Sequence, residues 1–280
     1  MSVKNPPVKG TNPKTTTRPR NQGDPDMPHP HQCTWQTSLA ILALLTAGAA
    51  QADFLVQHSG TADPTTEGFG LLSDTRTDHQ ARGAADPKWR GEDSWWSASA
   101  TAGASLGNYH YAPTGAQLSD MNTQGWKAEM RVLNNMVMDN FGPDNATDYG
   151  VGLALLTSIL DFEIYIGTDS SDNVTLYKWT SGGLSQITIP TVNAYQRYHT
   201  YAMTAAPGAS QATISIDGTV VGTVAGISGT YAPLFYFGSA SSDGIFSVNY
   251  SQVALSTIPE PASLGLLALG SLCLLRRRRS

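Results

Sequence analysis

The second half of the chain alternates between apolar and polar residues in short runs, which are separated by clusters of Gly, Asn, Asp and Ser. A period of two residues is typical of half-buried β-strands, whereas no run keeps the 3.6-residue apolar period of an ordinary helix. We therefore predict an all-β domain. The predicted strands cover residues 126–133, 149–157, 161–168, 173–180, 185–189, 197–204, 211–217, 219–224, 233–239 and 246–255.

Residues 213–217 (TISID) and 246–250 (FSVNY) alternate strictly, which predicts one face in a core and one polar face. Asp217-Gly218 separates two predicted strands and indicates a two-residue hairpin turn. About ten to fourteen strands without internal repeats favour a two-sheet antiparallel jelly-roll sandwich over a propeller.

Near the N-terminus, the apolar run SLAILALLTAGAA covers residues 38–50, and Ala50 and Ala52 form an Ala-x-Ala cleavage pattern. We predict a signal peptide at residues 27–52 that is cleaved after Ala52. A start at Met27 gives a signal peptide of ordinary length. Residues 1–26 are basic and proline-rich, and we interpret them as a disordered leader or an extension of the gene model.

The C-terminal residues 258–280 contain Pro259, Glu260 and Pro261, followed by an apolar run at residues 262–275. As a helix, this run would be ~21 Å long against a hydrocarbon core of ~30 Å, so by length alone we expect it to be a poor permanent membrane anchor. A cluster of basic residues after it would stop translocation and stay on the cytoplasmic side. The cluster consists of Arg276, Arg277, Arg278 and Arg279.

The Pro-Glu-Pro motif, the apolar helix and the terminal arginines, in this order, resemble the PEP-CTERM sorting signal of Gram-negative bacteria that make exopolysaccharide. The resemblance implies processing by an exosortase, a membrane-embedded cysteine protease-transpeptidase, near Pro259–Pro261. It further implies that the precursor is transiently anchored in the inner membrane and is then released to the cell surface or the extracellular matrix.

The predicted domain, residues 53–257, contains no cysteine, because Cys33 and Cys273 both lie outside it. This excludes disulfides, cysteine-ligated zinc and a cysteine nucleophile. The domain has eight Lys and Arg residues against 19 Asp and Glu residues, a net charge of −11. A domain this acidic repels nucleic acids and anionic lipids, which leaves neutral glycans, cations and basic partners.

Residues 197–255 combine a Tyr-His-Thr-Tyr strand, the Asp-Gly hairpin, a Phe-Gly turn and an aromatic closing strand. This segment resembles the concanavalin A-like lectin/glucanase superfamily, in particular its laminin-G-like modules. The resemblance implies a jelly-roll sandwich that binds or cleaves glycans. We expect no cofactor, and the resemblance implies one alternative, a calcium ion at a loop rim.

Two carboxylates on one strand would be needed for glycosidase chemistry, and Asp161 and Glu163 are two residues apart. They do not follow the Glu-x-Asp-x-x-Glu order of laminarinase-type enzymes, so we interpret them as a solvated polar strand face. We therefore expect no catalytic activity. Glu129 and Arg131 have the same spacing and predict a surface ion pair.

The loop at residues 168–173 offers Asp169, Asp172 and Asn173 as calcium ligands, although Asx turns alone would explain these residues. Trp89, Trp95 and Trp96 are candidates for stacking on sugar rings, with core packing as the alternative.

These observations favour an exported, non-enzymatic β-sandwich that is sorted by an exosortase and binds exopolysaccharide or other glycans. One alternative is a glycoside hydrolase or lyase on the same fold. Another is a structural or adhesion protein of the biofilm matrix, which would predict an exposed apolar patch.

Overall fold

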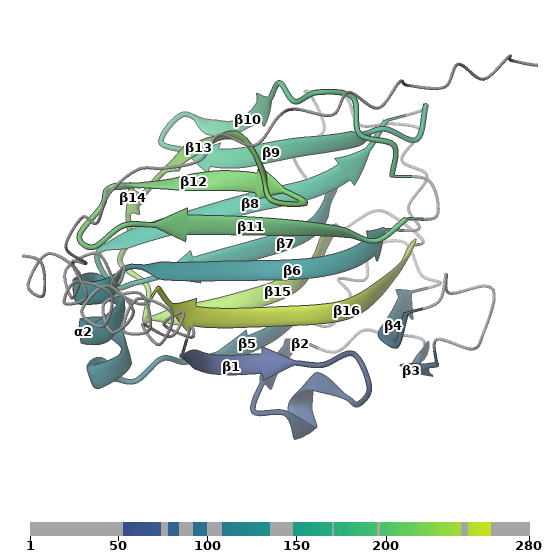
Figure 1. Ribbon diagram of the computed structural model, residues 1–280, viewed down its shortest axis with the longest axis horizontal. Coiled ribbons are helices and arrows are strands. Elements are labelled where there is room, and N and C mark those ends of the chain that lie inside the picture. The colour runs from purple at the N-terminus through teal and green to yellow at the C-terminus, as the bar shows by residue number, and fades with distance from the viewer. Residues whose placement is uncertain are drawn as a thin grey trace, which may run out of the picture. The chain divides into compact units, whose positions relative to one another are not determined.

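The computed structural model describes residues 53–73, 78–83, 92–99, 108–134, 148–169, 171–194, 197–241 and 246–258, all in a single compact unit. Their strands form two eight-stranded antiparallel sheets that pack face to face (Figure 1). This confirms the predicted all-β sandwich. The predicted signal peptide, the Pro-Glu-Pro motif, the C-terminal helix and the arginine cluster lie outside the described residues.

Sheet A has the order β13-β12-β11-β6-β16-β4-β3, and β1 also pairs with β16. Its strands are β1 (Phe54–His58), β3 (Asp78–Arg82), β4 (Ser94–Ser99), β6 (Trp126–Asn134), β11 (His199–Ala205), β12 (Gln211–Ile216), β13 (Thr219–Ala225) and β16 (Phe246–Thr257).

Sheet B has the order β10-β9-β8-β7-β15-β5-β2, and the short strand β14 pairs with the beginning of β8. Its strands are β2 (Gly70–Ser73), β5 (Asn108–Tyr111), β7 (Asp148–Leu156), β8 (Leu160–Thr168), β9 (Val174–Thr180), β10 (Gly183–Ile187), β14 (Ile227–Ser228) and β15 (Leu234–Ser241). The short 3-10 helix η1 (Pro64–Thr66) follows β1 in the chain.

The sequence analysis missed one helix, α2 (Gly115–Gln124), which lies at the end of the sandwich where β6 begins (Figure 1). Thr114 and Gln117 form a capping box, in which the Thr114 hydroxyl accepts from the Gln117 N–H and the Gln117 side chain accepts from the Thr114 N–H. The Thr-x-x-Gln spacing is therefore the signal that could have predicted this helix. No helix of the described part is long and apolar enough to cross a membrane.

The hairpin between β12 and β13 confirms the predicted turn. Ile216 pairs with Thr219, and the two intervening residues, Asp217 and Gly218, have φ angles of 49° and 79°. Both residues lie in the left-handed region that a type I′ turn requires. The Asp217 carboxylate also accepts hydrogen bonds from the Thr200 N–H, at 2.9 Å, and contacts His199 Nδ1 at 2.6 Å. These contacts tie the turn to β11.

The core lies where the inner faces of the two sheets meet, and aromatic rings fill one part of it. Phe237 of sheet B packs against Tyr109, Tyr250 and Phe69, with ring centroids 5.1, 5.1 and 5.2 Å apart. All four rings are at most 3% exposed. Because Tyr250 belongs to sheet A, these contacts hold the two sheets together.

The predicted alternation holds in β12, where Ala212, Ile214 and Ile216 are buried and the residues between them are partly exposed. It fails in β16, because Asn249, on the expected polar face, is completely buried. Its side-chain amide donates a hydrogen bond to Ser94 Oγ at 3.1 Å.

The predicted ion pair between Glu129 and Arg131 is also wrong, because Glu129 pairs with Lys127 and Arg131 pairs with Glu92.

We expect His58 to make stability depend on pH. His58 is completely buried beside Phe237, with Nδ1 bonded to the Glu67 carboxylate, and burial lowers the His58 pKa from 6.5. Above pH 6.5 the ring is neutral in both states. As the pH falls below 6.5, the unfolded state binds a proton that the folded state disfavours, so the free energy of unfolding decreases by up to about 1.4 kcal/mol per pH unit. Urea denaturation between pH 7 and pH 5 should show this slope. The variant His58→Gln should show a shallower slope, and equal slopes would refute this role for His58.

Candidate functional site

Strand β8 has one face in the core and one face on the outside of sheet B. Phe162 and Ile164 are at most 2% exposed and belong to the core cluster. Because neighbouring side chains of a strand point to opposite faces, Asp161, Glu163 and Tyr165 share the outer face. The structure therefore places the two carboxylates on one strand face, as predicted. The predicted solvation of this face is wrong, because Asp161 is only 8% exposed and both carboxylates line a pocket.

The pocket has a volume of about 450 Å³ and is built from segments that are far apart in the sequence. Strand β9 contributes Trp179, and the chain from β14 onwards contributes Ser228 and Tyr231. The register between β14 and β8 places Ile227 opposite Asp161. The described residues of the lining are Asp161, Glu163, Tyr165, Trp179, Ile227, Ser228 and Tyr231. We call it the acidic-aromatic pocket.

Asp161 lies deep in this pocket and is only 8% exposed. The chain passes directly beside its carboxylate, so that a Cβ atom on Gly229 would lie 2.2 Å from both carboxylate oxygens. Asp161 Oδ1 is buried and has no hydrogen-bond partner in the part of the chain that the structure describes. Burial without a compensating charge disfavours the ionised form, and the pKa of Asp161 is raised for this reason.

Glu163 lies beside Asp161 and receives a hydrogen bond from the Tyr165 hydroxyl, at 2.7 Å from Oε2. The Tyr165 hydroxyl is in turn 3.5 Å from the Tyr236 hydroxyl of β15. Burial raises the pKa of Glu163, the nearby charge of Asp161 raises it further, and the tyrosine hydrogen bonds partly oppose this shift. Burial likewise raises the pKa values of Tyr165 and Tyr236, so these hydroxyls stay protonated and can donate at neutral pH.

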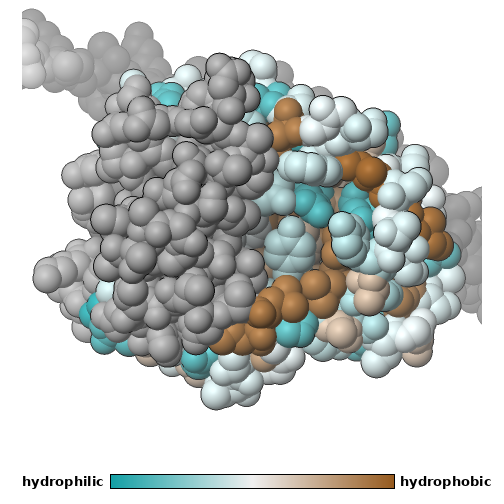
Figure 2. All heavy atoms as spheres, turned by 180° about the vertical axis from the view of Figure 1, so that it is seen from behind, coloured by the Kyte–Doolittle hydropathy of each residue, from teal (hydrophilic) through white to brown (hydrophobic). Residues whose placement is uncertain are grey.

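Two aromatic rings at the rim remain accessible, because Trp179 is 37% exposed and Tyr231 is 67% exposed. Figure 2 shows the side of the molecule opposite to that in Figure 1, and its coloured part has hydrophobic side chains interspersed with hydrophilic ones. Flat aromatic faces beside polar groups are suited to ligands that have both apolar and hydrogen-bonding surfaces, such as sugars. Sequence analysis did not single out Trp179 and Tyr231. The signal was the presence of Tyr177 and Trp179 at alternate positions of one strand, which places two large rings on its outer face.

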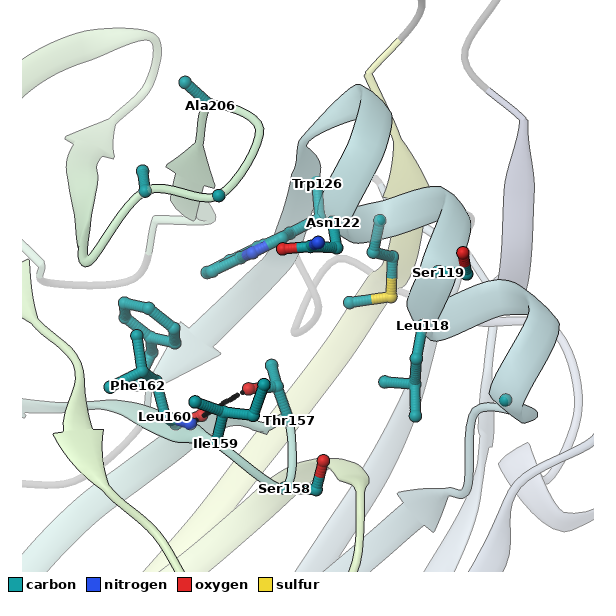
Figure 3. Close-up of a pocket in the computed structure, with 14 residues that line it drawn as sticks. Leu118, Ser119, Asn122, Trp126, Thr157, Ser158, Ile159, Leu160, Phe162 and Ala206 are labelled. Atoms are coloured by element: carbon teal, nitrogen blue, oxygen red, sulfur yellow. Dashed lines mark hydrogen bonds between the residues drawn. The ribbon is translucent and has the colours of Figure 1, made fainter.

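A second cavity, of about 530 Å³, lies at the end of the sandwich between α2 and the turns at residues 157–160 and 206–209. Figure 3 shows the rings of Trp126 and Phe162 next to each other, and their centroids are 5.1 Å apart in an edge-to-face arrangement. Leu118, Met121 and Ile159 add apolar surface, and none of the described residues that line this cavity is charged. It therefore offers apolar contacts with few polar groups to orient a ligand.

The structure separates the three tryptophans that were proposed for sugar stacking. Trp95 is only 7% exposed and donates a hydrogen bond from Nε1 to the Tyr109 hydroxyl at 2.8 Å, so it is a core residue. Its ring is not accessible to a glycan, because it fills the space between the sheets. Trp96 is partly exposed, with the Arg82 guanidinium 4.5 Å from its ring centroid. Trp89 lies outside the described residues.

The calcium candidates form an Asx turn. Asp169 Oδ1 accepts from the Ser171 and Asn173 N–H groups, each at 2.8 Å, and Oδ2 accepts from Asn173 Nδ2 at 3.2 Å. These donors, the Asn173 N–H first, lower the pKa of Asp169. Asp172 has a φ of 59° in the same turn. In the described ranges, no three His, Cys, Asp or Glu side chains gather as a metal site would require. The calcium site stays a prediction.

Comparison with known proteins adds one decisive observation at the C-terminus. Residues 257–279 match the PEP-CTERM protein-sorting motif. The motif begins at the last residue of β16, so the last strand of the sandwich is complete where the motif begins. The PEP-CTERM motif supports an exported protein that an exosortase sorts to the cell envelope.

No curated protein sequence matches the chain significantly. Among solved structures, the chain is similar to the carbohydrate esterase vb_24B_21 of the Shiga toxin-encoding bacteriophage phi24B, with 15% identity, a TM-score of 0.56, and coverage of 74% of this chain and 100% of the esterase chain. A CBM2 module of the Dit protein of Lactobacillus casei BL23 phage J-1 has 13% identity, a TM-score of 0.42, and coverage of 75% and 98%. At these identities the esterase supports the sandwich fold alone.

Gly229 provides a test of the close contact with Asp161. A methyl group at this position would overlap the carboxylate, so we expect Gly229→Ala to lower the free energy of unfolding by about 1–3 kcal/mol in urea denaturation. Shortening the partner in Gly229→Ala/Asp161→Ala should remove most of this penalty, because the two positions interact directly. The control is Gly115→Ala, where nothing lies within 4 Å of the added Cβ. If the effects of the two substitutions on the free energy of unfolding were additive, this would contradict the contact.

Proposed function

We propose that this protein is an exported, exosortase-processed glycan-binding protein without catalytic activity that acts at the cell surface or in the extracellular matrix. The acidic-aromatic pocket carries the proposal. It combines accessible rings of Trp179 and Tyr231 with the carboxylates of Asp161 and Glu163 on the outer face of sheet B. The rings offer a stacking surface for a pyranose, and the carboxylates and the Tyr165 hydroxyl offer hydrogen bonds to its polar groups.

The PEP-CTERM motif supports a location outside the cell for glycan binding. A sandwich that is released outside the cell would meet exopolysaccharide. The similar bacteriophage protein is described as a carbohydrate esterase, which is compatible with a glycan ligand on this architecture. Because one fold carries many functions, the proposal depends on the pocket rather than on this likeness.

Two alternatives differ in what they require. Cleavage of a polysaccharide would use Asp161 and Glu163 as an acid–base pair, which their raised pKa values favour.

A matrix protein that binds other proteins would present an apolar patch. The large exposed hydrophobic residues of the described part are Phe54, Leu72, Ile159, Trp179, Val220 and Tyr231, of which Trp179 and Tyr231 share the acidic-aromatic pocket.

Retention on immobilised polysaccharides tests glycan binding. We expect purified full-length protein to be retained without release of reducing sugar. We expect Trp179→Ala and Tyr231→Ala each to weaken retention about tenfold, because stacking of a sugar on an aromatic ring contributes on the order of 1–2 kcal/mol. Phe54→Ala is the matched control, since Phe54 is 46% exposed but lies on β1 of sheet A. Release of reducing sugar that disappears in Glu163→Gln would instead establish the enzymatic alternative.

Sorting has a separate test. Replacing Pro259, Glu260 and Pro261 with alanine in an exopolysaccharide-producing host should leave the precursor in the membrane fraction, whereas the natural sequence should yield a shorter released form. A strain without its exosortase should retain the natural sequence in the same way. Normal release of the alanine variant would overturn exosortase processing at this motif.

A further inference from the structure

The acidic-aromatic pocket contains negative charge that the described side chains do not balance. Asp161 and Glu163 both line it, and the described residues of the lining include no Lys, Arg or His. Asp161, which lines the pocket, is more than nine-tenths buried, and its Oδ1 atom is buried without a hydrogen-bond partner among the described residues. An unpaired buried carboxylate is unfavourable, and a positively charged hydrogen-bond donor would compensate it more strongly than a neutral one.

The nearest basic residue in the sequence is Lys178, and it does not serve this purpose. The register pairs Lys178 with Ile164, whose side chain belongs to the core face of β8, whereas Trp179 is in the lining of the pocket. Lys178 Nζ donates a hydrogen bond to the Thr223 carbonyl of β13 at 3.0 Å. Lys178 is therefore directed to sheet A, away from the two carboxylates.

The rim of the pocket also favours a cation. The rings of Trp179 and Tyr231 are accessible, and the electron-rich face of an aromatic ring attracts ammonium groups as well as sugar C–H groups. A calcium ion fits less well, because it takes six to eight oxygen ligands and the pocket supplies two carboxylates. A sugar ring that carries an ammonium group would satisfy both the rings and the carboxylates.

We propose that the acidic-aromatic pocket selects glycans that contain free amino sugars, with the protonated amine between Asp161 and Glu163 and the pyranose ring against Trp179. This rests on the proposed glycan-binding function and names its ligand class. The volume of about 450 Å³ lies in the usual range for sites that bind small molecules. N-acetylation removes the positive charge of the sugar, so an acetylated glycan loses the interaction that distinguishes this pocket.

The groups that face the two carboxylates determine how binding depends on pH. From β7, the residues opposite them are Leu156 and Ala154, which do not ionise. Tyr165 of the same strand, Tyr177 of β9 and Tyr236 of β15 have pKa values raised by burial and stay neutral. The segment from Ile227 to Tyr231 adds no acid or base other than Tyr231. Asp161 and Glu163 are thus the pocket groups that take up protons in acid, and amine binding should weaken as the pH falls from 6 to 4.

Calorimetric titration of the full-length protein in detergent would compare oligosaccharides of glucosamine, N-acetylglucosamine and glucose of equal length at pH 6. We expect the glucosamine oligomer to bind about tenfold more tightly than the other two, which corresponds to ~1.4 kcal/mol. Asp161→Asn and Glu163→Gln should each abolish this preference and leave glucose-oligomer binding within about threefold. Trp179→Ala should weaken binding of all three ligands, because each would stack its pyranose ring on Trp179.

Glu129→Gln on the outer face of sheet A and Asp120→Asn on α2 are the matched controls. They make the same chemical changes at described positions outside the pocket, and they should keep the preference. Loss of the preference in these controls would show general attraction to an acidic surface and overturn the proposal. Circular dichroism melting curves identify any variant that fails to fold, and the second pocket variant then supplies the test.

The remaining outcomes separate the two levels of the proposal. Equal binding of the glucosamine and N-acetylglucosamine oligomers would overturn selection for amino sugars while supporting glycan binding. Binding of none of the three oligomers, together with no retention on any polysaccharide, would overturn the proposed function itself. Displacement of the glucosamine oligomer by millimolar calcium at constant ionic strength would assign the carboxylates to a metal ion and overturn the amine site.

Discussion

Packing of the two inner sheet faces is the interaction on which the rest of the structure depends. Strand β8 contributes Phe162, Ile164 and Ile166 to this core, each at most 2% exposed. A strand whose alternate residues are buried must present the others on its outer face. The burial of these three residues therefore places Asp161, Glu163 and Tyr165 in one row. A one-residue shift in register would exchange the two sets and bury two carboxylates in the core.

The same packing gives the carboxylates their unusual surroundings. The chain that follows β13 returns across the beginning of β8, where β14 pairs with Leu160 and Asp161. Its close approach at Gly229 removes water from Asp161, and the tyrosines beside Glu163 cover the second carboxylate. The raised pKa values are a consequence of this burial. In such surroundings the electrostatic interactions of the two carboxylates are less screened than they would be in water.

The two ends of the described chain are compatible with processing at both termini. Thr257 donates a backbone hydrogen bond to the Asp53 carbonyl, and Ile258 donates one to the Gly125 carbonyl, each at 3.1 Å. The first and last described residues therefore lie close together beside α2. The predicted cleavage after Ala52 and processing near Pro259–Pro261 would both cut the chain outside the described strands. The core that positions the acidic-aromatic pocket would remain intact.

The sequence alone determined the fold class, the strands of the second half, the Asp217-Gly218 hairpin and the sorting motif, because each depends on local periodicity or a continuous motif. The short strands β1 to β5 were missed, since their stability comes from pairing with distant strands such as β15 and β16. Only the tertiary structure decided that Trp95 belongs to the core and Trp179 to the pocket rim. It alone placed Tyr231 beside Glu163 and Gly229 against Asp161, because contacts across about 70 residues of sequence have no local signature.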